Sequence, residues 1–347
     1  MEGCIHCQRN VLIEDGGTLI IATDQQKNAQ AYSDILSKYR IQNQVKNAYI
    51  HIEYDLIVQV QAVTALLDDH IEEKDKERMR GNIVVEKDLP DFVHFPLYPY
   101  KELEYRIRYP QYVNIIQNKR FTSHMQPIFC TKEGSVYGYE FLLRPSDDAY
   151  PFFPGELFSF SQRSGMQSML DSHARINAIR TGSERLKDEK IFINFLPSSI
   201  YDPAHCLKST FEAANTYNVN PERLVFEVVE TEKIVDVAHL KNIFYHYQNA
   251  GVKVALDDIG TGYATIDMLK QLNPDYAKID RSLIQDCHQH PDKIARIQAI
   301  SEVAKAQGTL LLGEGIETKE EYETVKSLVD YTQGYYFAKP QAEPFAG

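Results

Sequence analysis

The feature that most constrains the fold is a regular alternation of strand-like and helix-like segments from about residue 120 to the C-terminus. Eight segments have the length and composition of strands: Ser123–Cys130, Ser135–Arg144, Lys190–Leu196, Leu224–Glu230, Lys253–Ile259, Tyr276–Asp280, Thr309–Gly315 and Tyr331–Phe337. Helical patterns separate nearly all of them: Asp171–Leu186, Pro203–Tyr217, Ala238–Ala250, Tyr263–Leu272, Lys293–Gln307 and Lys319–Leu328. Such alternation is typical of a (β/α)₈ barrel.

One connection breaks this rule. Only Thr131–Gly134 separates the first two strands, and a parallel crossover needs about a dozen residues or more. The first two strands should therefore form an antiparallel hairpin. The sequence predicts an α/β fold, a TIM-like barrel whose first strand is antiparallel.

Residues 1–108 have a different pattern and predict a small α/β domain or extension, with a regulatory role, ahead of a barrel over residues 109–347. Gly17–Thr23 and Asn47–Tyr54 are expected strands, and residues 55–81 are expected to form one long helix. Asp88–Tyr109, rich in proline and aromatic residues, is expected to be a linker. Nothing in this part of the sequence indicates a ligand.

Charge and composition exclude several classes of function. The 37 basic and 49 acidic residues leave a net charge of −12, which disfavours unaided contact with nucleic acid or an anionic membrane. No apolar run approaches the roughly 20 residues of a membrane span, and the N-terminus lacks the pattern of a signal peptide. Five cysteines are too few for a disulfide framework, so a reducing cytoplasm is expected.

Cys4 and Cys7 form a CxxC motif with His6 between them. A second pair of ligands at zinc-finger spacing is missing, so zinc binding or a redox role is the minor alternative to an exposed N-terminal segment.

Polar residues gather at the C-terminal ends of the predicted strands, which meet at one face of a barrel. They are Glu140, Asn194, Glu227, Glu230, Asp257, Asp258, Lys278, Asp280, Glu314, Glu317 and Gln333. Their neighbours are apolar, as in FINF and VALDD. An acid in such a setting is costly to bury unless it is paired or bound to metal.

Six carboxylates in one small region need cations to remain ionised. They are Glu140, Glu227, Asp257, Asp258, Glu314 and Glu317. Oxygen ligands with one amide and no nearby His or Cys favour Mg²⁺ or Mn²⁺, and adjacent aspartates at one strand end suit a pair of metals of the kind used for in-line phosphoryl displacement. The alternative is that each acid caps a helix or pairs with a surface base.

Two further groups lie beside these acids. Glu230 is positioned to accept hydrogen bonds from Thr261 and the glycine-containing loop that follows Asp258. Arg144 follows the second strand and is suited to bidentate phosphate binding, with a surface salt bridge as the alternative.

In order and spacing, these segments resemble the EAL-domain phosphodiesterases, which hydrolyse cyclic di-GMP. The matching segments span about residues 110–340: Gln126-Pro-Ile, Glu140-Phe-Leu-Leu-Arg144, Phe192-Ile-Asn194, Glu227-Val-Val-Glu230, Asp257-Asp-Ile-Gly-Thr-Gly-Tyr263, Lys278-Ile-Asp-Arg281, Glu314-Gly-Ile-Glu317-Thr and Gln333-Gly-Tyr-Tyr-Phe-Ala-Lys-Pro340. Residues 1–108 lie outside the resemblance.

The resemblance implies a role for each matching residue. Glu140, Asn194, Glu227, Asp257 and Asp258 would be the metal ligands, for two Mg²⁺ or Mn²⁺ ions. Lys278 and Glu314 would be catalytic, acting with Glu140 at the attacking water. Gln126, Leu143, Arg144 and Gln333 would contact the ligand, while Glu317, Glu230 and Thr261 would support the site.

The chain departs from the family pattern at two positions. Phe141 stands where the name-giving motif has alanine, and Ile259 stands where phenylalanine is usual. Because neighbouring residues on a strand point to opposite faces, the bulk of Phe141 should fall in the layer between strands and helices. Both departures leave the inferred ligands in place.

The resemblance implies hydrolysis of cyclic di-GMP to linear pGpG by a cytoplasmic homodimer. Three alternatives remain: an EAL-like receptor that binds the dinucleotide without cutting it, a barrel that docks a protein partner, and another metal-dependent barrel enzyme. Degenerate receptors in the family lack metal-ligand acids, and this chain keeps them, which favours an active enzyme.

Overall fold

The computed structural model describes residues 13–85, 96–228, 236–260 and 265–346. The chain divides into two compact units, residues 1–120 with 147–170 and residues 121–146 with 171–347. The first unit contains β1 (Gly17–Ala22), α1 (Gln26–Lys38), β2 (Gln44–Lys46), β3 (Tyr49–Tyr54), α2 (Ile57–His70), α3 (Glu73–Lys76), β4 (Arg80–Val84), β5 (Tyr98–Pro99), α4 (Tyr100–Arg108), α5 (Pro110–Gln117) and α6 (Pro154–Arg163).

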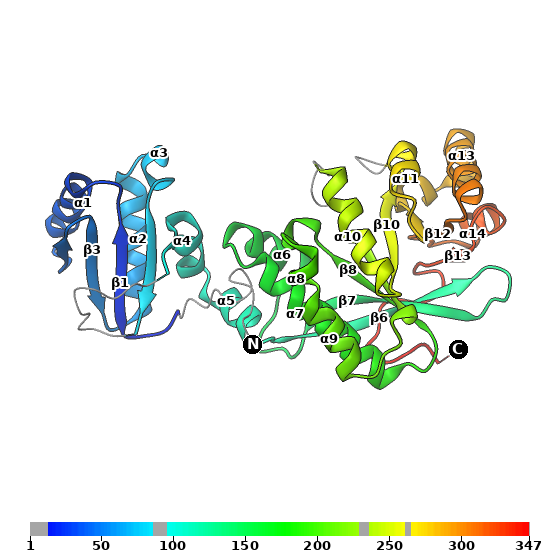
Figure 1. The fold of residues 1–347 in the computed structure, drawn as a ribbon, viewed down its shortest axis with the longest axis horizontal. Coiled ribbons are helices and arrows are strands. Elements are labelled where there is room, and N and C mark those ends of the chain that lie inside the picture. Colours follow the sequence, from blue (N-terminus) through cyan, green and yellow to red (C-terminus); the bar gives the residue numbers. More distant parts are fainter. Residues whose placement is uncertain (1–12, 86–95, 229–235, 261–264, 347) are drawn as a thin grey trace. The chain divides into compact units, whose positions relative to one another are not determined.

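The first unit is built on a five-stranded antiparallel sheet in the order β2-β3-β1-β4-β5 (Figure 1). Strand β3 alternates as predicted, with Ile50, Ile52 and Tyr54 buried and the intervening side chains more exposed. These side chains join a core with residues of α1, α2 and α4. A small α/β region before the barrel is thereby confirmed.

Two predictions for this unit were wrong. The expected helix over residues 55–81 ends at His70, because the backbone of Ile71 turns extended and its side chain enters the core; β4 then begins at Arg80. The expected linker over Asp88–Tyr109 contains β5 and α4 in its described part. Buried Leu103 and Ile107 on α4 pack into the same core, which is why that segment is helical.

The eight predicted strands of the second unit form a closed barrel. They are β6 (Phe121–Cys130), β7 (Val136–Pro145), β8 (Lys190–Phe195), β9 (Leu224–Val228), β10 (Lys253–Ile259), β11 (Tyr276–Ile279), β12 (Leu310–Gly313) and β13 (Tyr331–Thr332). Strand β6 is antiparallel to both of its neighbours, β7 and β13, and the other pairs are parallel. The predicted barrel with a reversed first strand is confirmed.

Helices alternate with the strands around the barrel (Figure 1). They are α7 (Gln167–Arg185), α8 (Pro203–Cys206), α9 (Lys208–Thr216), α10 (Val237–Asn249), α11 (Ile266–Leu272), α12 (Arg281–Ile284), α13 (Pro291–Gln307) and α14 (Lys319–Val325), with 3₁₀ turns at Pro197–Ser199, Pro221–Arg223 and Cys287–Gln289. Strand β13 is much shorter than predicted, so Gln333 follows the strand. In the part of the chain that is described, no helix combines the length and apolarity that crossing a membrane requires.

The interior of the barrel is layered, and the layers determine where the polar groups lie. One buried apolar cluster contains Ile128, Phe192, Val225, Ala255, Tyr276, Leu312 and Tyr331, one residue from each of seven strands. On each parallel strand of this set, the polar residue of interest follows two positions later: Asn194, Glu227, Asp257, Lys278, Glu314 and Gln333. On the reversed strand β6 it comes two positions earlier, at Gln126. Side chains two apart share a strand face, so the polar residues form the next layer along the barrel axis.

Phe141 lies on the opposite face of β7 from this layer, as predicted. A Cβ atom built on Gly182 of α7 would lie 3.3 Å from Phe141 Cζ and 2.6 Å from Ile191 Cδ1. The missing side chain at Gly182 therefore leaves room for the phenylalanine ring between the strands and α7. The large side chain at position 141 is accommodated without contact with the polar layer.

We predict that Phe141→Ala lowers the free energy of unfolding by about 3 kcal/mol, because it opens a cavity beside Gly182. Gly182→Ala alone should also destabilise the protein, because the new methyl group would crowd the ring of Phe141. In the double variant Phe141→Ala with Gly182→Ala the ring is absent, so the loss should be smaller than the sum of the two single effects. Urea denaturation followed by circular dichroism measures all three. Strict additivity would contradict this packing.

Candidate active site

The polar layer of the barrel is organised around one buried lysine. Lys278 is only 1% exposed, and its Nζ lies 2.8 Å from Glu314 Oε1 and 2.9 Å from Glu227 Oε2. Asp257 Oδ1 is 3.3 Å away and Glu140 Oε1 is 3.9 Å away. Five strands, β7 and β9 to β12, bring these groups together from positions far apart in the sequence. Four of the six predicted carboxylates therefore surround Lys278, and a fifth, Asp258, interacts with Asp257 and Lys278.

Two amides hold the carboxylate of Glu140. Asn194 Nδ2 donates a hydrogen bond to Oε1 at 2.9 Å, and Gln333 Nε2 donates to Oε2 at 2.8 Å. Both amides lie on the same layer as Glu140, on β8 and just after β13. Glu140 therefore has a fixed orientation. Because the amide nitrogens of Asn194 and Gln333 point toward Glu140, their amide oxygens point away from it.

The adjacent acids Asp257 and Asp258 lie at an irregularity in β10. The register between β10 and β11 shifts between Leu256 and Ile259, and Asp258 has a left-handed φ of 54°. Aspartate tolerates this conformation better than most residues. Asp257 Oδ1 accepts a hydrogen bond from the backbone N of Asp258 at 2.9 Å. A bulge of this kind re-aims side chains, which places two consecutive carboxylates beside one site.

Electrostatics show that the acids outnumber the positive charge available. Burial, reinforced by neighbouring acids, raises the pKa of Glu227 and of Glu314 well above the ordinary range, although Lys278 opposes the shift. Burial, then Asp257 and Asp280, raises the pKa of Asp258 to about 7. Burial alone would lower the pKa of Lys278, but the four carboxylates outweigh it and hold that pKa well above its usual value. The cluster is short of cations.

The donor set fits a hard divalent cation. Among the residues that the structure describes, Asn194 Oδ1 and Glu227 Oε1 are buried oxygens without a hydrogen-bond partner. Such atoms are costly to bury, and Mg²⁺ or Mn²⁺ takes oxygen ligands of this kind. No three acidic, histidine or cysteine side chains within the described ranges are already arranged as a metal cage. The ammonium of Lys278 lies between the carboxylates instead, so the fit is one of donor chemistry and of charge.

Three of the residues predicted to contact the ligand lie on or beside the strand face that carries Glu140. Gln126 pairs with Glu140 across the β6–β7 hairpin and its Nε2 is 3.4 Å from the carbonyl of Ala338. Arg144 shares the strand face of Glu140, and its Nη1 donates to its own neighbour's carbonyl, Leu143 O, at 2.7 Å. Gln333 contacts Glu140, so its amide nitrogen orients a predicted metal ligand.

Leu143, which the resemblance places at the ligand, lies on the other strand face from Glu140. Ser123, which pairs with Leu143 across the hairpin, donates a hydrogen bond from its hydroxyl to Asn177 of α7 at 2.9 Å. Leu143 is buried on that helix-facing side together with Phe141. Leu142, two positions from Glu140, lies on the same strand face as that acid and was overlooked; counting in twos from Glu140 would have identified it.

The remaining predicted residues are less closely connected to the cluster. Glu317 Oε1 forms an ion pair with Arg281 Nη2 at 2.6 Å, and no contact with Glu314 is observed among the described residues. Asp280, which the sequence placed at a strand end, interacts with Asp258 and caps α12 through Ser282 N. Glu230, Thr261, Cys4 and Cys7 lie outside the described residues.

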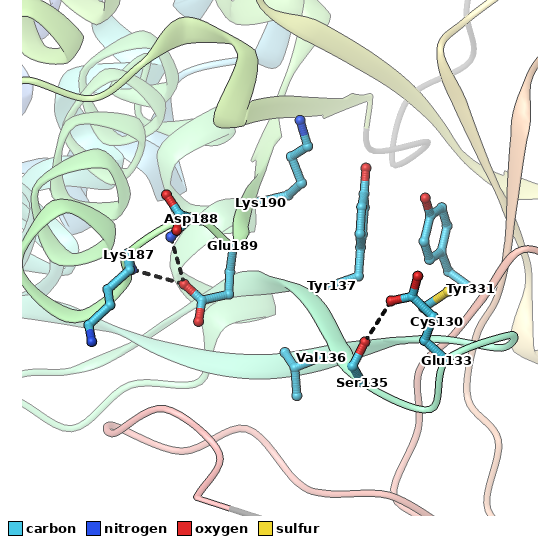
Figure 2. A pocket seen from close by; sticks show the side chains of 10 residues that line it. All are labelled: Cys130, Glu133, Ser135, Val136, Tyr137, Lys187, Asp188, Glu189, Lys190 and Tyr331. Carbon is cyan, nitrogen blue, oxygen red and sulfur yellow. Dashed lines mark hydrogen bonds between the residues drawn. The ribbon is translucent and has the colours of Figure 1, made fainter.

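A cavity of about 590 Å³ lies at the opposite end of the barrel from these acids (Figure 2). Its lining includes Lys190 and Tyr331, which begin β8 and β13, and Cys130, which ends the reversed strand β6. Tyr137 and Tyr331 stack there with ring centres 4.1 Å apart. The polar layer described above contributes no residue to this cavity, so the cavity is separate from the candidate active site.

Fold and polar layer together define a barrel protein with a carboxylate-rich site at the C-terminal ends of its strands. The family model for the EAL domain matches residues 111–340, and the chain belongs to the EAL-domain family.

Similar proteins agree with this assignment. The chain is 30% identical over 234 residues to "Probable cyclic di-GMP phosphodiesterase PdeG" and 29% identical over 231 residues to "Cyclic di-GMP phosphodiesterase PdeF", both of Escherichia coli K12. These matches cover 65% of this chain but only 45% and 30% of the two relatives, so the chain spans less than half the length of either.

Solved structures show the same fold. A standalone EAL protein of Vibrio cholerae, solved in its c-di-GMP-bound form, is 31% identical, has a TM-score of 0.59, and covers 64% of this chain and 93% of its own. Klebsiella pneumoniae BlrP1, in its calcium/cy-diGMP complex, is 20% identical with a TM-score of 0.59, over 94% of this chain and 96% of its own. At that identity the likeness concerns the fold alone.

We predict that Mn²⁺ at a hundredfold excess over its Kd raises the melting temperature of the protein by roughly 5 °C, because a cation relieves the surplus of buried negative charge. Glu227→Gln should lose most of this increase, since it removes one carboxylate at nearly constant volume. The exposed Glu133→Gln, at the other end of the barrel, is the matched control. Equal increases in all three proteins, measured by differential scanning fluorimetry, would contradict metal binding at this layer.

Proposed function

We propose that this protein is a Mg²⁺- or Mn²⁺-dependent phosphodiesterase that hydrolyses cyclic di-GMP to linear pGpG. The observation that carries the proposal is the cluster of four carboxylates around Lys278, with Asn194 and Asp258 beside it, in an EAL-domain barrel. The relatives named as cyclic di-GMP phosphodiesterases support the substrate.

In this proposal five residues hold two metal ions: Glu140, Asn194, Glu227, Asp257 and Asp258. A bound metal pair supplies a water of lowered pKa and positive charge next to the scissile phosphate. Bacillus subtilis YkuI, to which the chain is 25% identical, was solved with substrate c-di-GMP and calcium, which supports a divalent ion at this site.

Lys278 and Glu314 are the groups proposed to act on the attacking water, because Lys278 Nζ and Glu314 Oε1 lie 2.8 Å apart and the Glu314 side chain keeps 20% of its surface exposed. Glu314, beside Lys278, accepts the proton that the water loses as its oxygen bonds to phosphorus and one ester P–O bond breaks, and the sugar oxygen that leaves takes up a proton from solvent. Lys278 holds Glu314 and Glu227 in place and offsets the negative charge that develops on the phosphate oxygens.

The ligand-facing residues in this proposal are Gln126, Arg144 and Gln333, together with Leu142 on the strand face of Glu140. Arg144 is suited to pair with the second phosphate of the dinucleotide, because the protein as a whole is acidic and repels an anion. Residues 1–108 serve as a regulatory part ahead of the barrel, and the active form is a cytoplasmic homodimer; analytical ultracentrifugation tests the second point.

We predict that Glu140→Gln reduces pGpG formation on the order of 100-fold or more, because a carboxylate proposed to bind metal becomes a neutral amide. The experiment incubates cyclic di-GMP with Mg²⁺ or Mn²⁺ and separates the products by chromatography. Glu133→Gln, an exposed acid far from the layer, serves as the control with unchanged turnover. Wild-type turnover in the Glu140 variant would contradict the assignment.

The same experiment decides between the enzyme and the receptor. A wild-type protein that binds cyclic di-GMP in the presence of Mn²⁺ but forms no pGpG would be a receptor. The retention of the buried acids and of Lys278 favours the enzyme, since binding without hydrolysis does not need a proton acceptor beside the phosphate.

A further inference from the structure

The end of β10 is tied to a helix on the outside of the barrel by one arginine. Arg296 lies exposed on α13, and its Nη2 donates a hydrogen bond to the backbone carbonyl of Gly260 at 2.7 Å. Gly260 comes two residues after Asp258. Within the described ranges, Arg296 makes no observed contact with the groups around Lys278, and it lies outside the sequence motifs that carry the family resemblance.

The backbone that Arg296 holds is unusual along several consecutive residues. Asp258 and Gly260 both have positive φ, 54° and 102°, with Ile259 between them. Ile259 is fully buried, pairs with Ile279 of β11, and accepts a hydrogen bond from Asp280 N at 3.2 Å. Positive φ is costly outside glycine, so the conformation at Asp258 needs support from its surroundings.

Gly260 receives support from two sides. A Cβ atom built at this position would lie 2.2 Å from Leu283 Cδ1 and 3.5 Å from Ile300 Cδ1, so the backbone packs directly on α12 and α13. The guanidinium of Arg296 adds a charge-assisted hydrogen bond to the carbonyl. Packing limits how close Gly260 comes to the helices, whereas the hydrogen bond orients its peptide plane.

The conformation of this segment matters for the site because Asp257 and Asp258 are consecutive residues within the register shift of β10. Asp257 lies in the layer of Lys278, at 3.3 Å, and Asp258, the next residue, has a left-handed φ at the register shift of β10. The carbonyl that Arg296 holds belongs to the peptide after Gly260, whereas the carbonyl of Ile259 is held by Asp280 N. Arg296 therefore fixes the direction in which the chain leaves the bulge, and losing this bond removes one support of the left-handed conformation at Asp258.

We propose that Arg296 is a positioning residue for the Asp258 half of the metal site: by holding the carbonyl of Gly260 it keeps the bulge in the form that presents both aspartates together. This inference rests on the proposed function, in which Asp257 and Asp258 bind metal. It assigns a role to a residue on the outer helix layer that does not contact metal, water or substrate.

The test uses the full chain with Arg296→Ala, Arg296→Lys and the matched control Gln298→Ala, an exposed residue on the same helix. Arg296→Ala should raise the Mn²⁺ concentration for half-maximal hydrolysis about five- to tenfold, with kcat and KM for cyclic di-GMP at saturating Mn²⁺ within about twofold of the wild type. Arg296→Lys, which retains one charged donor, should recover part of the loss, and Gln298→Ala should match the wild type.

A merely structural role for Arg296 would change the melting temperature and leave the Mn²⁺ requirement of Arg296→Ala equal to that of Gln298→Ala, which would overturn the proposal. Calorimetric titration with Mn²⁺ alone gives a second reading that does not need turnover. If the wild type binds Mn²⁺ but makes no pGpG, the proposed function fails, while weaker Mn²⁺ binding by Arg296→Ala still supports the positioning role. Equal Mn²⁺ affinity in both proteins would overturn it.

Discussion

The structure of the barrel interior depends on a single buried ammonium group. Lys278 lies within 4 Å of four carboxylates that come from four other strands, and it is almost completely shielded from water. A lysine alone in this position would lose its charge, and four acids alone would repel one another. Each is tolerable only because the other is there. The lysine does not balance the acids, however, and the remaining negative charge is what makes this end of the barrel suited to divalent ions.

Around that ion cluster, hydrogen bonds and backbone conformation hold the acids in fixed orientations. Two amides donate hydrogen bonds to the two carboxylate oxygens of Glu140. A bulge with left-handed φ at Asp258 places two consecutive aspartates at the site, and Glu314 forms an ion pair with Lys278. These arrangements restrict the rotamers of the acids before any ligand arrives, which reduces the reorganisation that binding requires. Phe141 does not disturb these acids, because its ring lies on the other strand face, against α7 and the space beside Gly182. The large residue in the name-giving motif therefore leaves the polar layer unchanged.

Prediction from sequence succeeded for the strands and their inward faces, because side chains alternate between the two faces of a strand with a period of two residues. In the parallel strands a core residue is followed two positions later by a polar one, as with Val225 and Glu227, so strand identity and face come from local pattern. It failed where a contact distant in sequence decides the local structure. Helix α2 ends before Ile71, whose backbone is extended and whose side chain packs in the core. The segment around Leu103, predicted as a linker, is helical because Leu103 packs into the same core.

The sequence by itself determined the barrel, its reversed first strand and the set of acids, because a four-residue connection and two-residue periodicity are local properties of the chain. Tertiary structure alone decided which of those acids meet. It brought Glu140, Glu227, Asp257 and Glu314 to Lys278, turned Gln333 toward Glu140, and paired Glu317 with Arg281 instead. The physical reason is that strand order, register and the bulge at Asp258 set side-chain distances between residues far apart in the chain, and no local pattern encodes those distances.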